Sequence, residues 1–367
     1  MIYRTFNRSQ LLEFLDSGEY KRFNILPVTP MRIRSQVMNP YTGEDDTLLI
    51  IALNEENEIT GYCGILPGQI TGGFDGKIFW NTCWWTDPVE GKGAAVQLLY
   101  RMLKATDSKM VFSELTPHTR QIIEKFRDFA FPSIPEGLRG YIRLNLHGIL
   151  PARYSRFQKV SFLLRIADAV FNALIFPVTS LKKVRHLPPH VTLISPEKAD
   201  EETADFMHSM NNRELFNRTA EELNLIIAHP WVTGKSDRYE ADYTKYYFSA
   251  VANGFSTALY KIYISNVLSG ICYMTNRDGF IKIPYIVFRR EKHEIITKVV
   301  LYLIGREEGA HTFTTFNPFL SEDLKKGRTP FFLKKSMKRN FAIHRSYSGV
   351  DYRDTIVQDG AGDVIFT

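Results

Sequence analysis

Cysteine is scarce in this chain, which excludes the classes of protein that depend on it. Three cysteines occur in 367 residues, and Cys63, Cys83 and Cys272 form no CxxC pair and have no paired histidines nearby. A disulfide scaffold needs several cysteine pairs, and a structural zinc site needs clustered cysteine or histidine ligands. The sequence therefore predicts neither a disulfide framework nor a metal site, and it favours a reducing compartment.

Targeting signals and uncharged apolar runs are also scarce. The opening MIYRTFNRSQLLEF lacks the apolar core of a secretory signal, and the most apolar stretch, residues 160–178, carries Arg165 and Asp168 near its middle. Charged side chains are costly at the centre of a bilayer, so this stretch is not expected to span a membrane. These features predict a cytoplasmic protein.

The charge is modest in total and uneven along the chain. The formal net charge is +6. Residues 151–190 have seven Lys or Arg against Asp168 alone, and residues 324–346 have eight with no acid. No RNA-binding motif accompanies these stretches. The pattern favours anionic partners at particular places and no nucleic acid.

The most informative stretch is residues 78–104, where an aromatic run passes through a glycine turn into a helix. The run predicts a buried strand, and Gly91-Lys92-Gly93 precedes a helix with one apolar side. Two glycines let a ligand approach the backbone, and the free N–H groups of a first helical turn suit a phosphate. The turn matches neither the Walker loop nor the dinucleotide fingerprint. An ordinary turn before a packing helix is the alternative reading.

The surroundings of this turn resemble the GNAT superfamily of acyl-CoA N-acyltransferases. In that family two central strands splay apart, and a Q/R-x-x-G-x-G/A loop holds the pyrophosphate of coenzyme A. Here the loop reads PVEGKGA (88–94), followed by MVFSEL (110–115) and a helix ending in EKFRDFAF (124–131). The resemblance covers about the first 145 residues. It implies an α/β (α+β) fold with a mixed, mostly antiparallel central sheet flanked by helices.

The resemblance also implies acetyl-CoA as the cofactor and gives its position. The pantetheine arm would pair with the strand before the loop, and the loop amides would hold the pyrophosphate. The residues implied to bind the cofactor are Trp84, Trp85, Thr86, Gly91, Lys92, Gly93 and Ala94. Since adjacent strand residues point to opposite faces, at least one of the two tryptophans is expected to be core.

The catalytic residues have a weaker signature than the cofactor loop. The family often uses a tyrosine as the general acid at the position that Phe126 occupies here. The mechanism that remains is direct attack by an amine on the thioester, with solvent protonating the departing thiolate. Two base candidates are Glu114, near the end of the strand MVFSEL, and His118, just after it. A salt-bridged carboxylate and a surface residue at a helix start are the alternative readings. Cys83 is interpreted as a buried thiol.

An internal echo predicts that the second half of the chain repeats the first. ITGYCGI (59–65) matches LSGICYM (268–274), and LLYRML (98–103) matches VLYLIG (300–305) in the same order. The copy's strand IKIPYIVF (281–288) runs into RREKH without a glycine, so side chains would crowd a phosphate there. The copy is expected to be a GNAT-like domain that has lost cofactor binding.

These patterns predict that the chain is divided into three parts. They are an N-terminal GNAT acyl-CoA-binding domain (1–148), a basic amphipathic connector helix (149–189) and a C-terminal degenerate GNAT-like domain with a basic tail (190–367). The connector is interpreted as a helix packed between the two domains. In the alternative reading, residues 153–185 make a peripheral contact with an anionic membrane surface.

The predicted function is an acyl-CoA-dependent N-acyltransferase that acetylates a primary amine of a small acceptor. A narrower resemblance, through NRTAEELNLIIAHPWV (217–232) among other segments, is to tandem-GNAT acetyltransferases of bacterial surface-polysaccharide gene clusters. It implies an amino-sugar acceptor, nucleotide-linked in one reading, whose phosphate the basic tail would suit. Two alternatives stay open: a non-catalytic GNAT-like binding or scaffolding protein, and an aminoacyl- or peptidyl-transferase.

Overall fold

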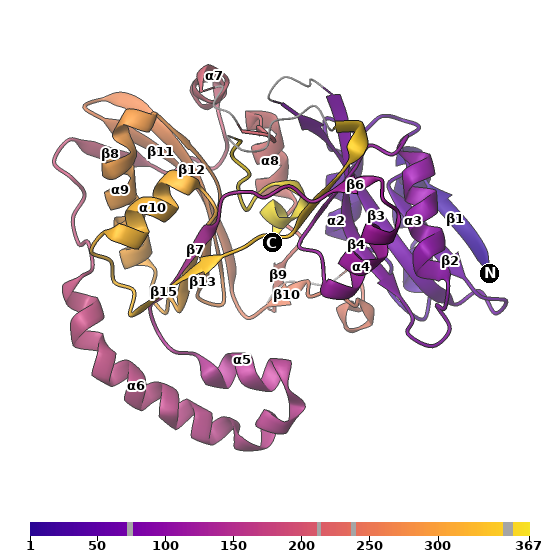
Figure 1. Cartoon of the computed structure of the whole chain (residues 1–367), viewed down its shortest axis with the longest axis horizontal. Coiled ribbons are helices and arrows are strands. Elements are labelled where there is room, and N and C mark those ends of the chain that lie inside the picture. The colour runs from indigo at the N-terminus through magenta and orange to yellow at the C-terminus, as the bar shows by residue number, and fades with distance from the viewer. Residues whose placement is uncertain (72–75, 211–213, 236–239, 348–354) are drawn as a thin grey trace. The chain divides into compact units, whose positions relative to one another are not determined.

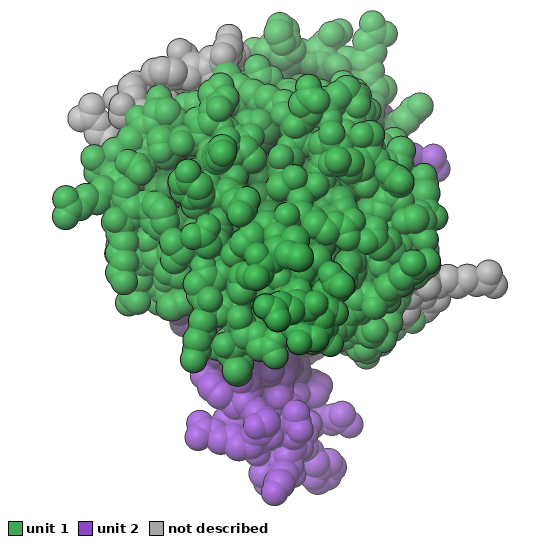
Figure 2. Space-filling view, turned by 90° about the vertical axis from the view of Figure 1, so that its right-hand side faces the viewer, with its two compact units in different colours: residues 1–135, 198–255, 339–367 green, residues 136–197, 256–338 purple. Residues whose placement is uncertain are grey.

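The chain forms two compact units, which Figure 2 shows in separate colours. The computed structural model describes residues 1–71, 76–210, 214–235, 240–347 and 355–367. Unit 1 consists of residues 1–135, 198–255 and 339–367, and unit 2 of residues 136–197 and 256–338. Both units are thus assembled from separated stretches of chain, whereas the sequence analysis predicted contiguous domains.

Unit 1 is built on a seven-stranded sheet with the order β1-β2-β3-β4-β5-β16-β6. Neighbouring strands are antiparallel except β4 and β5, which run parallel. The strands are β1 (Ile2–Phe6), β2 (Leu49–Leu53), β3 (Ile59–Ile70), β4 (Gly76–Thr86), β5 (Met110–Ser113), β16 (Phe341–His344) and β6 (Phe129–Ala130). The predicted succession from the first strand through the hairpin and glycine loop to the helix after β5 is confirmed.

Helices cover both faces of this sheet. Two apolar clusters bury its two faces: α3 (Ala94–Ala105) and α4 (Pro117–Lys125) pack on one, and α1 (Arg8–Asp16) and α2 (Pro30–Val37) on the other. The middle of the chain adds α7 (Glu201–Ser209), α8 (Ala220–Ala228) and the short parallel pair β9 (Thr233–Gly234) and β10 (Val251–Ala252). The core of unit 1 therefore lies on both sides of β3 and β4.

Helix α2 lies in a polar stretch where no local sequence pattern predicts a helix. The helix begins at Pro30, and the Thr29 side chain accepts a hydrogen bond from the Arg32 amide as its cap. Polar residues such as Arg32 and Gln36 are buried on this helix beside Ile33. Because these polar residues break the apolar pattern, the periodicity that marks a helix is absent from the sequence.

Unit 2 repeats the architecture of unit 1, as the internal echo predicted. Its sheet has the order β8-β11-β12-β13-β14-β7-β15, and a parallel pair, β13 and β14, occupies the place of β4 and β5. Its strands are β7 (Gly137–Tyr141), β8 (Val191–Ile194), β11 (Phe255–Ile264), β12 (Val267–Arg277), β13 (Phe280–Phe288), β14 (Thr312–Thr315) and β15 (Leu333–Met337). Its helices are α5 (Leu146–Arg153), α6 (Ser161–Leu181), α9 (His293–Arg306) and α10 (Pro318–Lys326).

The glycines shared by the two repeats have one packing role. A Cβ added at Gly61 of β3 would lie 3.1 Å from Leu98 Cδ1 of α3, and one at Gly270 of β12 would lie 3.1 Å from Ile296 Cδ1 of α9. In both units the missing side chain therefore allows the helix to pack closely on the sheet.

Each sheet also contains a strand that the other half of the sequence supplies. β7 follows the first segment of unit 1 in sequence, yet it pairs with β14 and β15 and lies, in magenta, among the orange strands of unit 2 (Figure 1). β16 follows the last segment of unit 2, yet it pairs with β5 and β6 of unit 1. The two units thus exchange one strand each, and neither half of the sequence contains a complete sheet.

This exchange predicts how the chain responds to a cut. A chain ending at residue 150 lacks β16 and carries an unpaired β7, so we expect it not to fold by itself. The complementary piece, 151–367, lacks β7 and should fail equally. Co-expression of the two pieces should restore a folded complex, visible as one cooperative thermal transition. Cooperative unfolding of the isolated 1–150 piece would contradict the assignment of β16 to the first sheet.

Candidate functional site

The parallel strands β4 and β5 pair over a short length and then separate. Their registered pairs within the described residues are Phe79 with Met110 and Trp80 with Val111. Beyond these pairs β4 continues to Thr86, while β5 pairs on its other side with β16. The later residues of β4 therefore present a strand edge to which an extended ligand carrying amide groups can pair.

A β-bulge lies in β4 where this separation begins. Gly64 of β3 is opposite Cys83 and Ile65 is opposite Asn81, so that Thr82 is the extra residue. A Cβ at Gly64 would lie 2.4 Å from the Thr82 hydroxyl, and the glycine thus makes room for the bulge. Bulges interrupt the ladder and re-aim backbone groups, so amides near Thr82 can act as hydrogen-bond donors toward the gap.

Helix α3 begins at the same edge, and its two glycines have different roles. A Cβ at Gly91 would lie 2.4 Å from the carbonyl oxygen of Asp87 and 2.8 Å from that of Thr60, so the fold of the loop itself requires glycine there. Gly93 has φ +83° and no atom within 4 Å of an added Cβ. No side chain of the described residues caps the helix at Gly93. The space beside Gly93 at the start of the helix is therefore open, although the Ala94 amide already donates to the carbonyl oxygen of Gly91 at 2.9 Å. An open helix start of this kind suits an anion.

The other residues predicted for cofactor binding divide between core and surface. Trp84 packs toward the α3 face with its ring 6.4 Å from Phe112, and Trp85 lies on the opposite face with its ring 5.6 Å from Tyr62. Both tryptophan side chains thus serve the core, and what they offer a ligand is the backbone of β4. Lys92 is exposed beside Gly93.

Glu114 and His118 follow β5 on the same side of the sheet. Because β4 and β5 are parallel neighbours, the segments that leave their carboxyl ends, including the α3 start, emerge at one edge. Glu114 has φ +55°, an uncommon conformation for a non-glycine residue. Its carboxylate is 56% exposed and accepts a 3.0 Å hydrogen bond from Nε of Arg339. His118 is exposed on the first turn of α4.

Phe126 and Cys83 belong to the core. Phe126 caps the end of α4 and packs against the cluster that includes Leu98 and Phe112. Cys83 is buried, and burial raises the pKa of its thiol. An aromatic ring without a hydroxyl cannot donate a proton, and a buried neutral thiol is a poor nucleophile. Neither residue is therefore available for acid or nucleophilic chemistry.

Sequence reasoning missed a buried polar cluster behind the bulge. Arg32 of α2 stacks its guanidinium 3.9 Å from the Trp231 ring centre and donates a long 3.5 Å hydrogen bond to the carbonyl oxygen of Thr82. Burial raises the pKa of Asp363 to about 6, although the charge of Arg32 acts in the opposite direction. The cluster joins residues more than 300 positions apart, and Arg32 lies in a helix without an apolar period, so no local signal could have found it.

The predicted basic tail is not a free surface. Arg339 is buried, and its guanidinium donates to the carbonyl oxygens of Gln358 and Ala361 as well as to Glu114. Arg218 donates likewise to the carbonyl oxygens of Gly360 and Gly362. These arginines fix the last residues of the chain inside unit 1. The remaining cations of the stretch lie in or beside α10 and β15 of unit 2, except Arg345, which follows β16 in unit 1.

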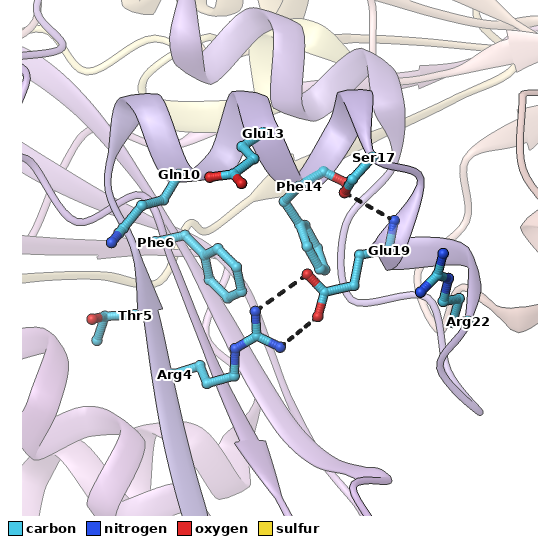
Figure 3. A pocket seen from close by; sticks show the side chains of 9 residues that line it. All are labelled: Arg4, Thr5, Phe6, Gln10, Glu13, Phe14, Ser17, Glu19 and Arg22. Carbon is cyan, nitrogen blue, oxygen red and sulfur yellow. Dashed lines mark hydrogen bonds and ion pairs between the residues drawn. The ribbon is translucent and has the colours of Figure 1, made fainter.

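A separate pocket of about 450 Å³ lies between β1 and α1 (Figure 3). Arg4 and Glu19 close one side of it with hydrogen bonds of 2.6 and 3.3 Å, so the charges that line this side already satisfy each other. None of the residues predicted for binding or catalysis lines it. We therefore place the candidate site at the β4–β5 edge.

Comparisons with known proteins identify the fold. No protein-family model matches the chain, and no curated protein matches it. Among solved structures, a GCN5-related N-acetyltransferase from Anabaena variabilis aligns with a TM-score of 0.51 at 12% identity, over 93% of this chain and 72% of that chain. One from Kribbella flavida aligns with a TM-score of 0.50 at 12% identity, over 93% and 70%. The chain therefore has the GNAT fold, as the sequence predicted.

Buried carboxyls near the C-terminal residues predict a pH dependence of stability. Burial raises the pKa of Glu214 from 4.5 to about 8, against a lowering by the hydrogen bond from Gln358. The folded state thus holds a proton that the unfolded state releases near pH 4.5. Stability should be highest below that pH and fall as pH rises toward 8, by at most about 1.4 kcal/mol per pH unit.

Urea unfolding at several pH values between 5 and 8 measures this decline. Glu214→Gln keeps an acceptor for Gln358 and removes the titration, so the decline should become shallower and the variant should exceed the parent at the alkaline end. Glu13→Gln, on the exposed face of α1, is the matched control and should retain the parental slope. An unchanged slope in Glu214→Gln would contradict the assignment.

Proposed function

We propose that the chain is an acyl-CoA-dependent N-acyltransferase that works at the β4–β5 edge of unit 1. The observation that carries the proposal is the separation of β4 from β5 beside an uncapped helix that starts at an open Gly93. An extended ligand with an anionic end fits this pair of features, since the strand edge offers amide pairing and the helix start offers N–H donors. The GNAT fold of the chain agrees with it.

The residues present fit coenzyme A in unit 1 and not in unit 2. At Gly93 the space that a Cβ would fill is free, which leaves room for a pyrophosphate at the start of α3, with Lys92 adding charge. The Ala94 amide donates to the carbonyl oxygen of Gly91 at 2.9 Å and would turn from it to reach the ligand. The pantetheine amides would pair with the backbone of Trp84, Trp85 and Thr86. In unit 2, the equivalent connection is a 3-10 turn, Arg290–Lys292, without glycine. We therefore propose one coenzyme A site per chain.

The acyl thioester supplies an activated carbonyl, and residues of unit 1 supply the remaining groups. Glu114, with its half-exposed carboxylate, is proposed to hold the acceptor amine, and His118 to take the proton that the attacking nitrogen loses. Amides at the Thr82 bulge donate to the carbonyl oxygen as negative charge develops there. Since Phe126 has no hydroxyl, water is proposed to protonate the departing thiolate.

The acyl group is proposed to be acetyl. The acceptor is proposed to be the primary amine of a small amino sugar, with a nucleotide-linked amino sugar as the most specific form of the proposal. The support is the likeness of residues 217–232 to acetyltransferases of surface-polysaccharide gene clusters. In the structure this segment contributes α8 and Trp231 to unit 1, and Trp231 packs on Arg32 behind the bulge. The segment therefore lies in the unit that carries the proposed chemistry.

Binding of coenzyme A tests the first part of the proposal. Calorimetry should give one coenzyme A site per chain. Gly93→Val should abolish binding, because the valine side chain fills the open space at the start of α3. Gly309→Val is the matched control: Gly309 also has a positive φ, +76°, and open space around it, but lies in unit 2. Both variants should lose a similar stability, about 1–2 kcal/mol, and the control should bind normally.

Two results would contradict the assignment of this loop. One is normal binding by a folded Gly93→Val variant, and the other is equal loss of binding in Gly309→Val. Gly91→Val separates the roles of the two glycines, because its Cβ would meet the backbone of Asp87. It should lower stability by about 3 kcal/mol or more through overpacking.

Acetyl transfer to amino-sugar substrates tests the catalytic roles. His118→Ala should lower kcat/KM by roughly 10²–10⁴-fold. Glu114→Gln should mainly raise KM for the amine, because Arg339 retains two carbonyl acceptors and the fold is preserved. His208→Ala, exposed on α7, is the control and should be unaffected. Tight coenzyme A binding without transfer to any amine would favour the non-catalytic binding protein instead.

A further inference from the structure

Helix α6 exposes most of its apolar surface. Only Asp168 and Thr179 of the helix are buried, and the whole helix belongs to unit 2, whereas the sequence analysis predicted a connector packed between two domains. Together with the preceding turn, it is the one stretch of the described residues with the length and composition of a membrane-crossing helix. Large side chains that are more than half exposed include Phe162, Leu163, Val170, Leu174, Phe176, Val178 and Leu181. An apolar surface of this extent marks a site of interaction.

One narrow stripe fixes α6 to the rest of unit 2. Asp168 accepts hydrogen bonds of 2.9 Å from the amides of Leu146 and His147 at the start of α5, and Asn172 bonds both backbone groups of Leu144. The ring of Phe171 lies 5.3 Å from that of Phe332. These contacts order the helix through one side and leave its other sides uncovered.

Apart from Asp168, the charged residues of the stretch that contains this helix are all positive. Burial would raise the pKa of Asp168, but hydrogen bonds from the amide and ring of His147 outweigh burial and lower it, so this one acid between residues 146 and 186 is ionised and internally paired. The basic residues of the same stretch are Arg153, Arg156, Lys159, Arg165, Lys182, Lys183 and Arg185. Apolar side chains flanked by unpaired cations match the surface of an anionic membrane.

The topology decides that α6 lies on a bilayer and does not cross it. Strand β7 precedes α5 and α6, strand β8 follows them, and both strands belong to the same hydrogen-bonded sheet. A crossing helix would place these two strands on opposite sides of the membrane, which a single sheet does not permit. Arg165 and Asp168 near the middle of the helix also disfavour the bilayer centre.

We propose that α5, the turn Ser155–Val160 and α6 form an amphipathic arm that docks unit 2 on an anionic membrane surface. The apolar side chains of α6 enter the boundary between headgroups and acyl chains, and the flanking Lys and Arg contact lipid phosphates. A second copy of the chain is the less favourable occupant, because two arms with the same uncompensated positive charge repel each other. The inference does not depend on the proposed acyl transfer.

Vesicle co-sedimentation with the full chain tests the arm. The chain should pellet with vesicles of phosphatidylcholine containing phosphatidylglycerol and stay in solution with phosphatidylcholine alone. High salt should weaken binding. Arg156→Gln with Lys159→Gln should lower partitioning about thirty-fold, since each basic residue near an anionic surface contributes about five-fold. Lys104→Gln with Lys109→Gln changes the net charge equally on exposed residues of unit 1 and should have no effect.

Two further variants separate insertion from surface charge alone. Leu174→Glu, at a position 72% exposed, should lower partitioning about ten-fold or more, whereas Val267→Glu, 54% exposed elsewhere in unit 2, should not. A polarity-sensitive dye on Leu174→Cys should shift to the blue with anionic vesicles, because the chain's own three cysteines are buried and stay unlabelled.

Three outcomes would overturn the proposal. They are equal binding to neutral and anionic vesicles, insensitivity to both arm variants, and a dimer in light scattering that Leu174→Glu dissociates while vesicles bind neither form. The last result would assign the apolar face of α6 to a second copy. Binding that needs anionic lipid and is lost in both arm variants supports it.

Discussion

The short pairing of β4 with β5 is the constraint on which the rest of unit 1 depends. Strands β4 and β5 pair at two registered positions and then separate. The separation leaves an unpaired edge on each of the two strands. β16 satisfies β5, and it comes from near the C-terminus of the chain. The last residues must therefore return to unit 1, where Arg339 and Arg218 bind their carbonyl oxygens. The free edge of β4 is what remains for a ligand.

The two units share one architecture and differ in the connection between the central strand and the helix that follows it. Unit 2 has the same three features: a parallel strand pair, a register shift between β12 and β13, and a glycine, Gly270, against which α9 packs closely. It replaces the glycine loop by the 3-10 turn Arg290–Lys292, which contains no glycine. The repeat thus preserves the sheet and its packing helix, while the loop that would give the fold a cofactor is present in unit 1 alone among the described residues.

The loop glycines illustrate the limit of a motif. Gly91 and Gly93 look equivalent in the sequence, yet backbone atoms crowd the first and nothing crowds the second. The motif predicted a glycine turn before a helix, and α3 does begin after Gly93; the neighbours of each Cα decided the role of each glycine. The same holds for Glu114, a base candidate by position, which the fold brings to Arg339 across more than 200 residues of sequence.

The sequence by itself determined what depends on near neighbours: the succession of strands and helices, the glycine turn, the internal repeat and the helical character of residues 161–181. Each leaves a local period or spacing that sterics and burial impose. Only the tertiary structure decided that β7 and β16 change places, that α2 is a helix with buried polar residues, and that Arg32 lies behind the bulge. These outcomes follow from contacts between distant residues, which leave no local pattern. The exposure of α6 belongs with them, because an apolar stripe looks the same in sequence whether protein or lipid covers it.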